Sequence, residues 1–178
     1  MSSGLPDYLV ILIVEDRKDD VVLIRRALTE AAVPNPVHVV GDGEEAQAYL
    51  LGIGQYVDRS QFPLPDLILL DLKMPKIDGF ELLRWIRAQP GLKTLRVVVL
   101  TSSEDVYDIH RAYELGANSF LVKPQEFINF KAMMGTLGSF WLKYSQSPKL
   151  DIEKARPASP GINLNNPDPG TAPPGTPA

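Results

Sequence analysis

The chain has 178 residues and a hydrophobic content of 44%, which is enough for one domain with a substantial core. It contains no cysteine, so disulfides and thiolate metal sites are excluded, and a reducing cytoplasm fits. The net charge of −4 argues against bulk binding of nucleic acid. No apolar run approaches the roughly 20 residues of a membrane span, and residues 1–7 lack the pattern of a signal peptide. We therefore expect a cytoplasmic protein that binds neither membrane nor nucleic acid directly.

The first half of the chain alternates between strand and helix patterns. Residues 9–14 are an unbroken apolar run rich in β-branched side chains, which is typical of a strand buried on both faces. Apolar residues then recur at helical spacing over 21–31. A short strand over 37–40 and a short helix over 44–51 follow. Residues 52–65 form a long connection, rich in glycine and proline, to which we assign no chemistry.

The second half repeats this alternation around the apolar run Leu67 to Leu70, which ends on Asp71. Pro75 and Asp78-Gly79 then force a turn, and Asp78 is the expected cap of the next helix. The remaining expected elements are a helix over 80–88, a strand over 97–100, a helix over 104–115, a strand over 119–122 and a helix over 125–144. This alternation predicts an α/β fold of three layers, a doubly wound, five-stranded parallel sheet between helices.

The composition changes from residue 145 onward, where prolines are frequent and no aromatic residue occurs. Such a segment cannot bury enough apolar surface to fold by itself. We therefore expect a flexible N-terminus over 1–6, a folded domain over 7–144 and a disordered, proline-rich tail over 145–178.

Residues able to do chemistry follow four of the expected strands. Glu15 and Asp16 follow the first strand, Asp71 ends the third, Thr101 follows the fourth and Lys123 follows the fifth. In a doubly wound sheet, the carboxyl ends of parallel strands meet at one edge, where such folds bind ligands. We therefore expect carboxylates, a hydroxyl and an ammonium to lie together there.

That combination suits phosphoryl transfer assisted by a divalent cation. Neighbouring carboxylates raise each other's pKa unless a cation neutralises them, and a set of oxygen ligands suits Mg²⁺. A carboxylate such as Asp71 can attack phosphorus and form an aspartyl phosphate. Lys123 can pair with one phosphate oxygen and Thr101 can hydrogen-bond another. The chain has no phosphate-binding loop for a nucleotide, so the donor is expected to be another protein or a small acyl phosphate.

Taken singly, these residues have simpler explanations. Asp71 could merely end a strand and cap a helix, Thr101 could be a strand-ending hydroxyl, and Lys123 could be a solvated charge. Asp19 is the expected N-cap of the first helix, and Asp19 and Asp20 fit the positive end of its dipole. It is the ordered set, one position per strand, that favours the functional interpretation.

The set of motifs resembles the receiver domain of two-component response regulators over residues 7 to 144. The matching motifs are Val14-Glu15-Asp16, Leu70-Asp71-Leu72-Lys73-Met74-Pro75 with Asp78-Gly79, Leu100-Thr101-Ser102, and Lys123-Pro124. The resemblance implies a flavodoxin-like fold with strand order 2-1-3-4-5. It also implies that the chain is a phosphorelay signalling protein, not an enzyme, which assists its own phosphorylation and dephosphorylation.

The resemblance assigns roles to individual residues. Asp71 would accept a phosphoryl group from a sensor histidine kinase. Glu15, Asp16 and Asp71 would hold Mg²⁺, together with the backbone carbonyl of Lys73. Glu15 stands where aspartate is commoner in the family, so we expect its metal contact to run through water.

The same resemblance implies a conformational switch. Thr101 and Phe120 would be the switch pair, and the bond between Lys123 and Pro124 would be a cis peptide. Phe120 has no hydroxyl, so the switch would depend on packing. Its output would be the face formed by helix 4, strand 5 and helix 5.

A stand-alone bacterial regulator that acts through protein–protein contact is expected, because only the proline-rich tail follows the receiver region. In the last expected helix, Ile128, Phe140 and Leu142 lie off the main apolar stripe. They could pack locally, or they could form with Trp141 a homodimer interface on the helix 4–strand 5–helix 5 face. The ending Phe140-Trp141-Leu142 and the long connection resemble the small regulators that partner phytochrome-type histidine kinases.

Two other functions stay open from the residues. Phosphohydrolases of the haloacid-dehalogenase type also form an aspartyl phosphate, but they need a second acid where this chain has Lys73. A phosphorylation-independent interaction module on the same fold is also possible. The three clustered acids argue against that module, because it would have no need for charges that repel one another.

Overall fold

The computed structural model describes residues 8–146, 148 and 150. In chain order its elements are β1 (Ile11–Val14), α1 (Lys18–Glu30), β2 (Val37–Val40), α2 (Gly43–Leu51), the 3-10 turn η1 (Gly54–Tyr56), β3 (Leu67–Leu70), α3 (Gly79–Ala88), β4 (Arg96–Thr101), α4 (Val106–Glu114), β5 (Ser119–Val122), α5 (Phe127–Gly138) and the π-helical turn η2 (Ser139–Tyr144). None of the helices described is long and apolar enough to cross a membrane. The expectations for 1–6 and for most of 145–178 lie outside the described residues.

The five strands form one parallel sheet in the order β2-β1-β3-β4-β5, which confirms the predicted fold. Every residue of β1, β3 and β4 is buried, as expected for strands covered on both faces. Val14 pairs with Leu70, and Thr101 pairs with Val122. The residues that follow β1, β3 and β5 therefore leave the sheet at the same edge.

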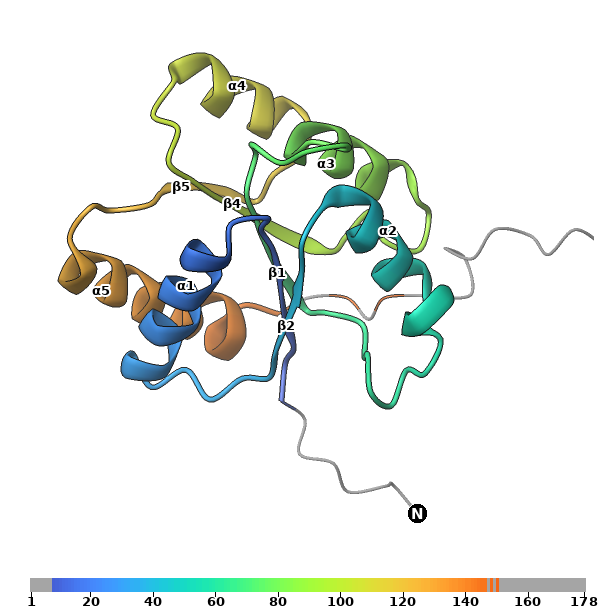
Figure 1. The fold of residues 1–178 in the computed structure, drawn as a ribbon, viewed down its shortest axis with the longest axis horizontal. Coiled ribbons are helices and arrows are strands. Elements are labelled where there is room, and N and C mark those ends of the chain that lie inside the picture. Colours follow the sequence, from blue (N-terminus) through green and yellow to red (C-terminus); the bar gives the residue numbers. More distant parts are fainter. Residues whose placement is uncertain (1–7, 147, 149, 151–178) are drawn as a thin grey trace, which may run out of the picture.

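Helices cover the two faces of the sheet unequally (Figure 1). α1 and α5 pack against each other on one face, and α2, α3 and α4 lie on the other. Alternate residues of β1 point to opposite faces of the sheet. Ile13 lies in the core under α1 and α5 together with Met134, and Leu12 lies in the core under α2, α3 and α4 together with Leu83. Two separate cores thus hold the central strands rigidly.

The start of α1 differs from the prediction in one respect. The expected N-cap, Asp19, lies in the first helical turn, and Arg17 is the N-cap without a side-chain cap. The backbone N–H of Arg17 donates to the Glu15 carboxylate at 3.1 Å, so the chain turns early and the helix begins at Lys18. Asp19 and Asp20 therefore interact with the helix dipole instead of capping the helix.

The connection from β3 to α3 is short and tightly packed. Asp78 forms the predicted cap, as part of a capping box in which its carboxylate accepts from the Glu81 N–H at 2.8 Å. Gly79 lies against the backbone of Asp71 and Leu72, and a Cβ atom there would collide with the Asp71 carbonyl oxygen. Glycine at this position therefore lets α3 begin directly beside the end of β3.

The long connection over 52–65 has a structural role. Tyr49, Tyr56 and Phe62 pack together over the end of α2, with ring centroids 5.0 to 6.1 Å apart. Phe62 meets both tyrosine rings edge to face, and the two tyrosine rings are tilted against each other. The Arg59 guanidinium donates to the carbonyl oxygens of Tyr49 at 2.7 Å, Leu50 at 2.8 Å and Phe62 at 3.1 Å. Arg59 thereby joins two carbonyls at the end of α2 and one carbonyl of the connection to a single side chain.

Arg59→Ala is expected to lower the free energy of unfolding by about 2–3 kcal/mol, because it removes three hydrogen bonds from a charged side chain to backbone carbonyls. Arg84→Ala is the control, since Arg84 lies exposed on α3, and its change is expected to stay within about 0.5 kcal/mol. Urea denaturation of both variants measures the difference. Equal free energies of unfolding for the two variants would show that the hydrogen bonds of Arg59 do not stabilise the connection over 52–65.

Candidate functional site

The structure brings the predicted site residues together at the carboxyl edge of the sheet. Glu15 and Asp16 follow β1, Asp71 follows β3, Thr101 is the last residue of β4 and Lys123 follows β5. Glu15, Asp16 and Asp71 each offer a carboxylate oxygen, and these oxygens all lie within 4.8 Å of one another. The strand register alone explains this convergence, because the residues follow paired positions on neighbouring strands.

The three acids differ in exposure. Glu15 is 3% exposed and Asp71 is 7% exposed, whereas Asp16 faces solvent. Burial raises the pKa of Asp71, although Lys123, the backbone N–H of Lys73 and the Thr101 hydroxyl act in the opposite direction. Burial also raises the pKa of Glu15, against the opposing effect of Lys123. Two partly desolvated carboxylates with raised pKa values mark this edge as a place where a cation binds favourably.

Asp71 is oriented by its own loop. Its Oδ2 accepts a hydrogen bond from the backbone N–H of Lys73 at 3.0 Å. Its Oδ1 lies 3.8 Å from the Nζ of Lys123. The Lys73 side chain itself is exposed, so Lys73 contributes its backbone to this contact.

Lys123 is held by two carboxylates besides Asp71. Its Nζ lies 2.6 Å from Glu15 Oε2 and 2.8 Å from Asp20 Oδ2. Burial alone would lower the pKa of Lys123, but its hydrogen bonds to Asp20 and Glu15 outweigh burial and leave that pKa raised. Lys123 is therefore a permanent cation in this site.

Asp20 is a residue that the sequence analysis did not place in the site. It was assigned only to the helix dipole, because a helix in a sequence does not reveal which neighbour its first turn faces.

Thr101 is connected to α4 by hydrogen bonds. Its side chain is almost completely buried, and its Oγ1 accepts from the backbone N–H of Ser103 at 3.3 Å. The Ser103 hydroxyl in turn donates to Asp108 Oδ2 at 2.6 Å in the first turn of α4. Phe120 is partly buried against the core on the α4 side, and its N–H donates to the Tyr113 hydroxyl at 3.2 Å. The sequence analysis identified Thr101 and Phe120 but did not predict that Ser103 and Asp108 link Thr101 to α4.

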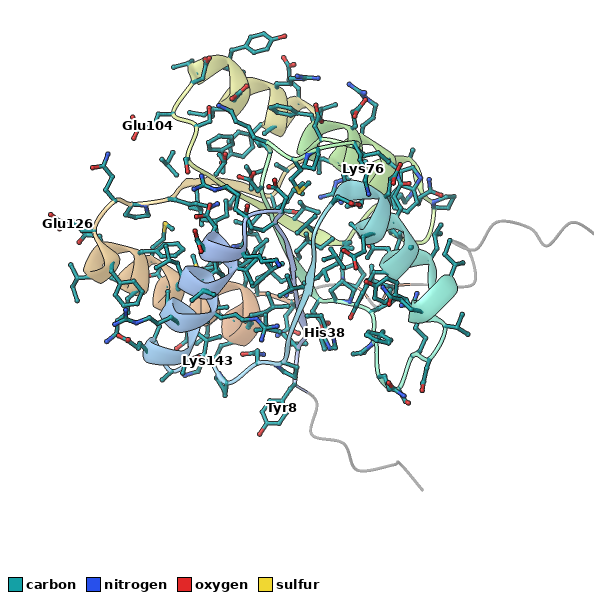
Figure 2. All side chains as sticks on the ribbon, in the orientation of Figure 1. Tyr8, His38, Lys76, Glu104, Glu126 and Lys143 are labelled. Atoms are coloured by element: carbon teal, nitrogen blue, oxygen red, sulfur yellow. The ribbon has the colours of Figure 1, made fainter. Side chains whose placement is uncertain are left out.

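The loop after Asp71 is tied to the neighbouring helix. Lys76 adopts a positive φ of 63°, and its Nζ lies 2.6 Å from Asp42 Oδ2 and 3.4 Å from Glu44 Oε2. Figure 2 shows Lys76 beside the N-terminal end of α2. Asp42 also caps that helix by accepting from the Glu45 N–H at 2.8 Å. The loop that carries Lys73 is therefore anchored at both ends.

The expected cis peptide between Lys123 and Pro124 was wrong, because no cis peptide bond occurs among the described residues. The trans form of a bond before proline is favoured by roughly 0.5–1 kcal/mol unless its surroundings select cis. Here the trans bond already lets Lys123 reach Glu15 and Asp20, so nothing in its contacts requires the cis form.

The predicted interface residues divide into two pairs. Ile128 and Phe140 are exposed, at 66% and 55%. Trp141 and Leu142 instead pack against the core under α1 and α5, and the carbonyl of Trp141 accepts from the Arg96 guanidinium at 2.6 Å. The local packing that the sequence left open for Ile128, Phe140 and Leu142 therefore applies to Leu142, and Trp141 packs against the same core.

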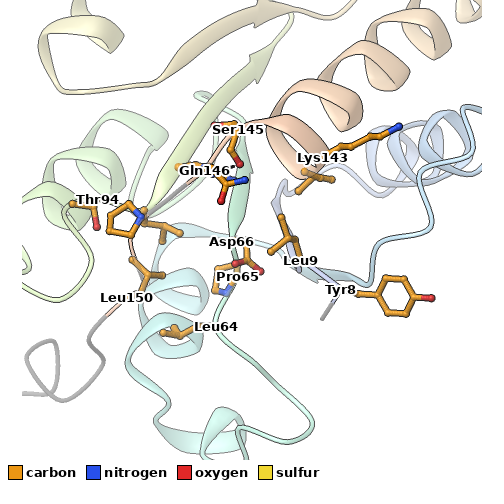
Figure 3. A pocket seen from close by; sticks show the side chains of 14 residues that line it. Tyr8, Leu9, Leu64, Pro65, Asp66, Thr94, Lys143, Ser145, Gln146 and Leu150 are labelled. Carbon is orange, nitrogen blue, oxygen red and sulfur yellow. Dashed lines mark hydrogen bonds between the residues drawn. The ribbon is translucent and has the colours of Figure 1, made fainter. Parts of the chain in front are cut away.

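A cleft of about 710 Å³ lies at the opposite, amino edge of the sheet (Figure 3). Its lining includes Leu9, Asp66 and Arg96, which stand at or just before the starts of β1, β3 and β4. The guanidinium of Arg96 is already engaged by the carbonyls of Trp141 and Ser145. Reactive groups gather at the carboxyl edge instead, which makes that edge the candidate site.

Comparison with known proteins agrees with this geometry. A model of the response regulator receiver domain matches residues 11–134. Response regulator Rcp1 of Synechocystis sp. is 40% identical over 134 residues, which cover 75% of this chain and 89% of the relative.

Solved structures give the same result. The phosphorylated cyanobacterial phytochrome response regulator RcpA is 39% identical, with a TM-score of 0.73 and coverage of 80% of this chain and 99% of that one. The Mn²⁺-bound form of response regulator Rcp1 is 38% identical, with a TM-score of 0.70 and coverage of 79% and 99%. Since the family model spans most of the described domain and these relatives are covered over nearly their whole length, the chain belongs to the response regulator receiver domain family of two-component signalling.

Proposed function

We propose that Asp71 accepts a phosphoryl group from a sensor histidine kinase, in a reaction that requires Mg²⁺. The observation that carries the proposal is the position of Asp71, a buried carboxylate with an ammonium 3.8 Å from one oxygen and a backbone N–H on the other. In the transfer, a carboxylate oxygen of Asp71 forms a bond to phosphorus. The bond from phosphorus to the leaving group breaks, and that group departs with the electron pair.

The residues present fit a hard divalent cation. Three carboxylate oxygens from Glu15, Asp16 and Asp71 lie within 4.8 Å of one another, and oxygen ligands in small number suit Mg²⁺. We assign these three residues and the backbone carbonyl of Lys73 as its ligands. The solved Mn²⁺-bound form of the related Rcp1 supports a metal at this kind of site. When bound, the ion neutralises the charge that builds up between carboxylates and phosphoryl oxygens.

Lys123 and Thr101 are assigned to the transferred group. Lys123 carries a fixed positive charge at the site and can pair with a phosphoryl oxygen as the group arrives. Thr101 ends β4 beside Asp71 and can donate its hydroxyl to a second oxygen. Both side chains stand on the ends of strands, so their positions are set by the sheet.

The signal is proposed to leave the site through Thr101. A phosphoryl group on Asp71 offers new acceptor oxygens, which draw the Thr101 hydroxyl toward them. Movement of Thr101 disturbs its contact with Ser103, which is joined to α4 through Asp108. Phe120 can then repack, and the face of α4, β5 and α5 changes for its protein partner.

The partners are proposed from the relatives and from the exposed surface. The similarity to Rcp1 and to a phytochrome response regulator supports a phytochrome-type histidine kinase as phosphoryl donor and a stand-alone mode of action. We also propose a homodimer through α4, β5 and α5. Large exposed side chains on these elements support the dimer: Ile128 and Phe140 near α5, and Val106 and Tyr107 on α4.

Incubation with acetyl phosphate and Mg²⁺ is expected to add one phosphoryl group to the wild-type chain, detected as intact mass. Asp71→Asn and EDTA are each expected to abolish the adduct, since one removes the nucleophile and the other the ion. An adduct that survives Asp71→Asn would contradict the assignment of Asp71. Continuous turnover of a phosphomonoester would favour a phosphohydrolase, and kinase binding unchanged by Asp71→Ala would favour an interaction module.

Asp71→Asn is expected to raise the free energy of unfolding at pH 7 in EDTA by on the order of 1 kcal/mol. The folded-state pKa of Asp71 is raised, so the charged carboxylate costs stability at neutral pH. As the pH falls toward that pKa, the folded wild type takes up the proton, and the difference in free energy of unfolding between the two proteins becomes smaller. Mg²⁺ should also reduce this difference, because it binds and stabilises the folded wild type.

Urea denaturation from pH 4 to 7 measures both effects. Asp19→Asn is the control, because Asp19 is an exposed acid. A variant at Asp71 that is less stable than wild type at pH 7 in EDTA would refute the expectation.

The double variant Ile128→Asp, Phe140→Asp is expected to weaken the homodimer about tenfold or more, because it places two charges in an apolar contact. Val57→Asp, at an exposed valine in the connection over 52–65, should leave the dimer intact. Sedimentation velocity over a range of concentrations gives both dissociation constants. A wild-type chain that stays monomeric with and without acetyl phosphate would overturn the dimer proposal.

A further inference from the structure

Lys123 is shared between the site and the first turn of α1. Its Nζ lies 2.8 Å from Asp20 Oδ2 and 2.6 Å from Glu15 Oε2, both within hydrogen-bond distance. The distance to Asp71 Oδ1 is 3.8 Å, which is an ion pair without a hydrogen bond. In this state Lys123 therefore makes its hydrogen bonds away from the phosphoryl acceptor.

The proposed transfer favours hydrogen bonds from Lys123 on the side of Asp71. A phosphoryl group on Asp71 adds acceptor oxygens on the Asp71 side of Lys123, and an ammonium has only three N–H donors. Glu15 and Asp20 already take two of them. Glu15 is buried at the end of β1, whereas Asp20 stands on a helix and is partly exposed. Asp20 is the partner that Lys123 can leave at the lower cost, because its side chain is 16% exposed and that of Glu15 is 1% exposed, so water can replace Lys123 more readily at Asp20.

We propose that Asp20 is a positioning residue that holds Lys123 toward α1 before phosphorylation and competes with the phosphoryl group for it. This inference rests on the proposed function of Asp71. Asp20 touches neither Asp71 nor the transferred group in the geometry described, and it acts only through Lys123. Its removal frees a donor of Lys123 for the incoming oxygens and so speeds formation of the aspartyl phosphate.

Asp19 provides a matched control for this inference. Asp19 and Asp20 are adjacent, carry the same charge and lie in the first turn of α1, where both favour the helix dipole. Asp19 is exposed and has no ion pair with Lys123, whereas Asp20 has one at 2.8 Å. Asp19→Asn and Asp20→Asn therefore change the net charge and the helix end equally, and they differ in the contact with Lys123.

The experiment follows the phosphoryl adduct over time by intact mass, with acetyl phosphate as donor and Mg²⁺ at a concentration shown to saturate each protein. In each transfer an Asp71 oxygen bonds to phosphorus and acetate leaves with the electron pair. Asp20→Asn is expected to speed adduct formation about fivefold or more, the effect of losing one competing charge-assisted hydrogen bond. Asp19→Asn should stay within about twofold of wild type, and Asp20→Glu should restore the wild-type rate.

A second readout reports on Lys123 itself. The ¹⁵N resonance of the Lys123 ammonium is expected to move in Asp20→Asn and to stay in place in Asp19→Asn. Equal rates for the two asparagine variants, or slower transfer in Asp20→Asn, would overturn the inference while leaving Asp71 as acceptor. A wild type that gains no adduct would contradict the proposed function of Asp71. In that case the ammonium resonance still tests Asp20 separately, because a resonance unchanged by Asp20→Asn would overturn its role in positioning Lys123.

Discussion

The balance of charge around Lys123 governs the carboxyl edge of this protein. Glu15, Asp20 and Asp71 contact one ammonium there, and Asp16 lies close to Glu15 and Asp71. Two of these four acids, Glu15 and Asp71, are buried almost completely. Burial raises the pKa of Asp71 and Glu15, so the fold holds these charges at a cost in stability. A site with surplus negative charge attracts a divalent cation, and the phosphoryl transfer that we propose for Asp71 depends on such a cation. The same charges that weaken the fold thus make the proposed chemistry possible.

The burial of the apolar strands offsets this loss of stability. β1, β3 and β4 are buried along their whole length, and parallel pairing fixes their register. Because Val14 pairs with Leu70, the acids that follow these residues cannot move apart without breaking the ladder. Lys76 and Asp42 anchor the loop on the far side of Asp71. The ends of the buried strands therefore hold Asp71 in place, and side chains from helices and loops position the groups around it.

The sequence predicted the parallel sheet and the convergence of Glu15, Asp16, Asp71, Thr101 and Lys123, because long apolar runs and the position after each run are properties of local sequence. The strand order followed only from the resemblance of the motifs to receiver domains. It did not predict which side chains pair across elements. Asp20 was assigned to a helix dipole, since nothing in the sequence shows that the first turn of α1 faces the end of β5. The expected cis bond before Pro124 was wrong because isomer choice depends on tertiary contacts. Trp141 and Leu142 stand in the π-helical turn after α5 and pack against the core, and which side chains of such a turn face the core is likewise set by tertiary contacts.

The unequal packing of the helices explains why a small change at Thr101 can reach the surface. α3 buries five residues, from Gly79 to Ile86, whereas Ala112 is the residue that α4 buries completely. A helix that buries little apolar surface is held by a small free energy, so it is displaced more readily than its neighbours. α4 is also joined to Thr101 through Ser103 and Asp108. If phosphorylation draws Thr101 toward Asp71, α4 is the element that moves at the lowest cost, and its exposed Val106 and Tyr107 move with it.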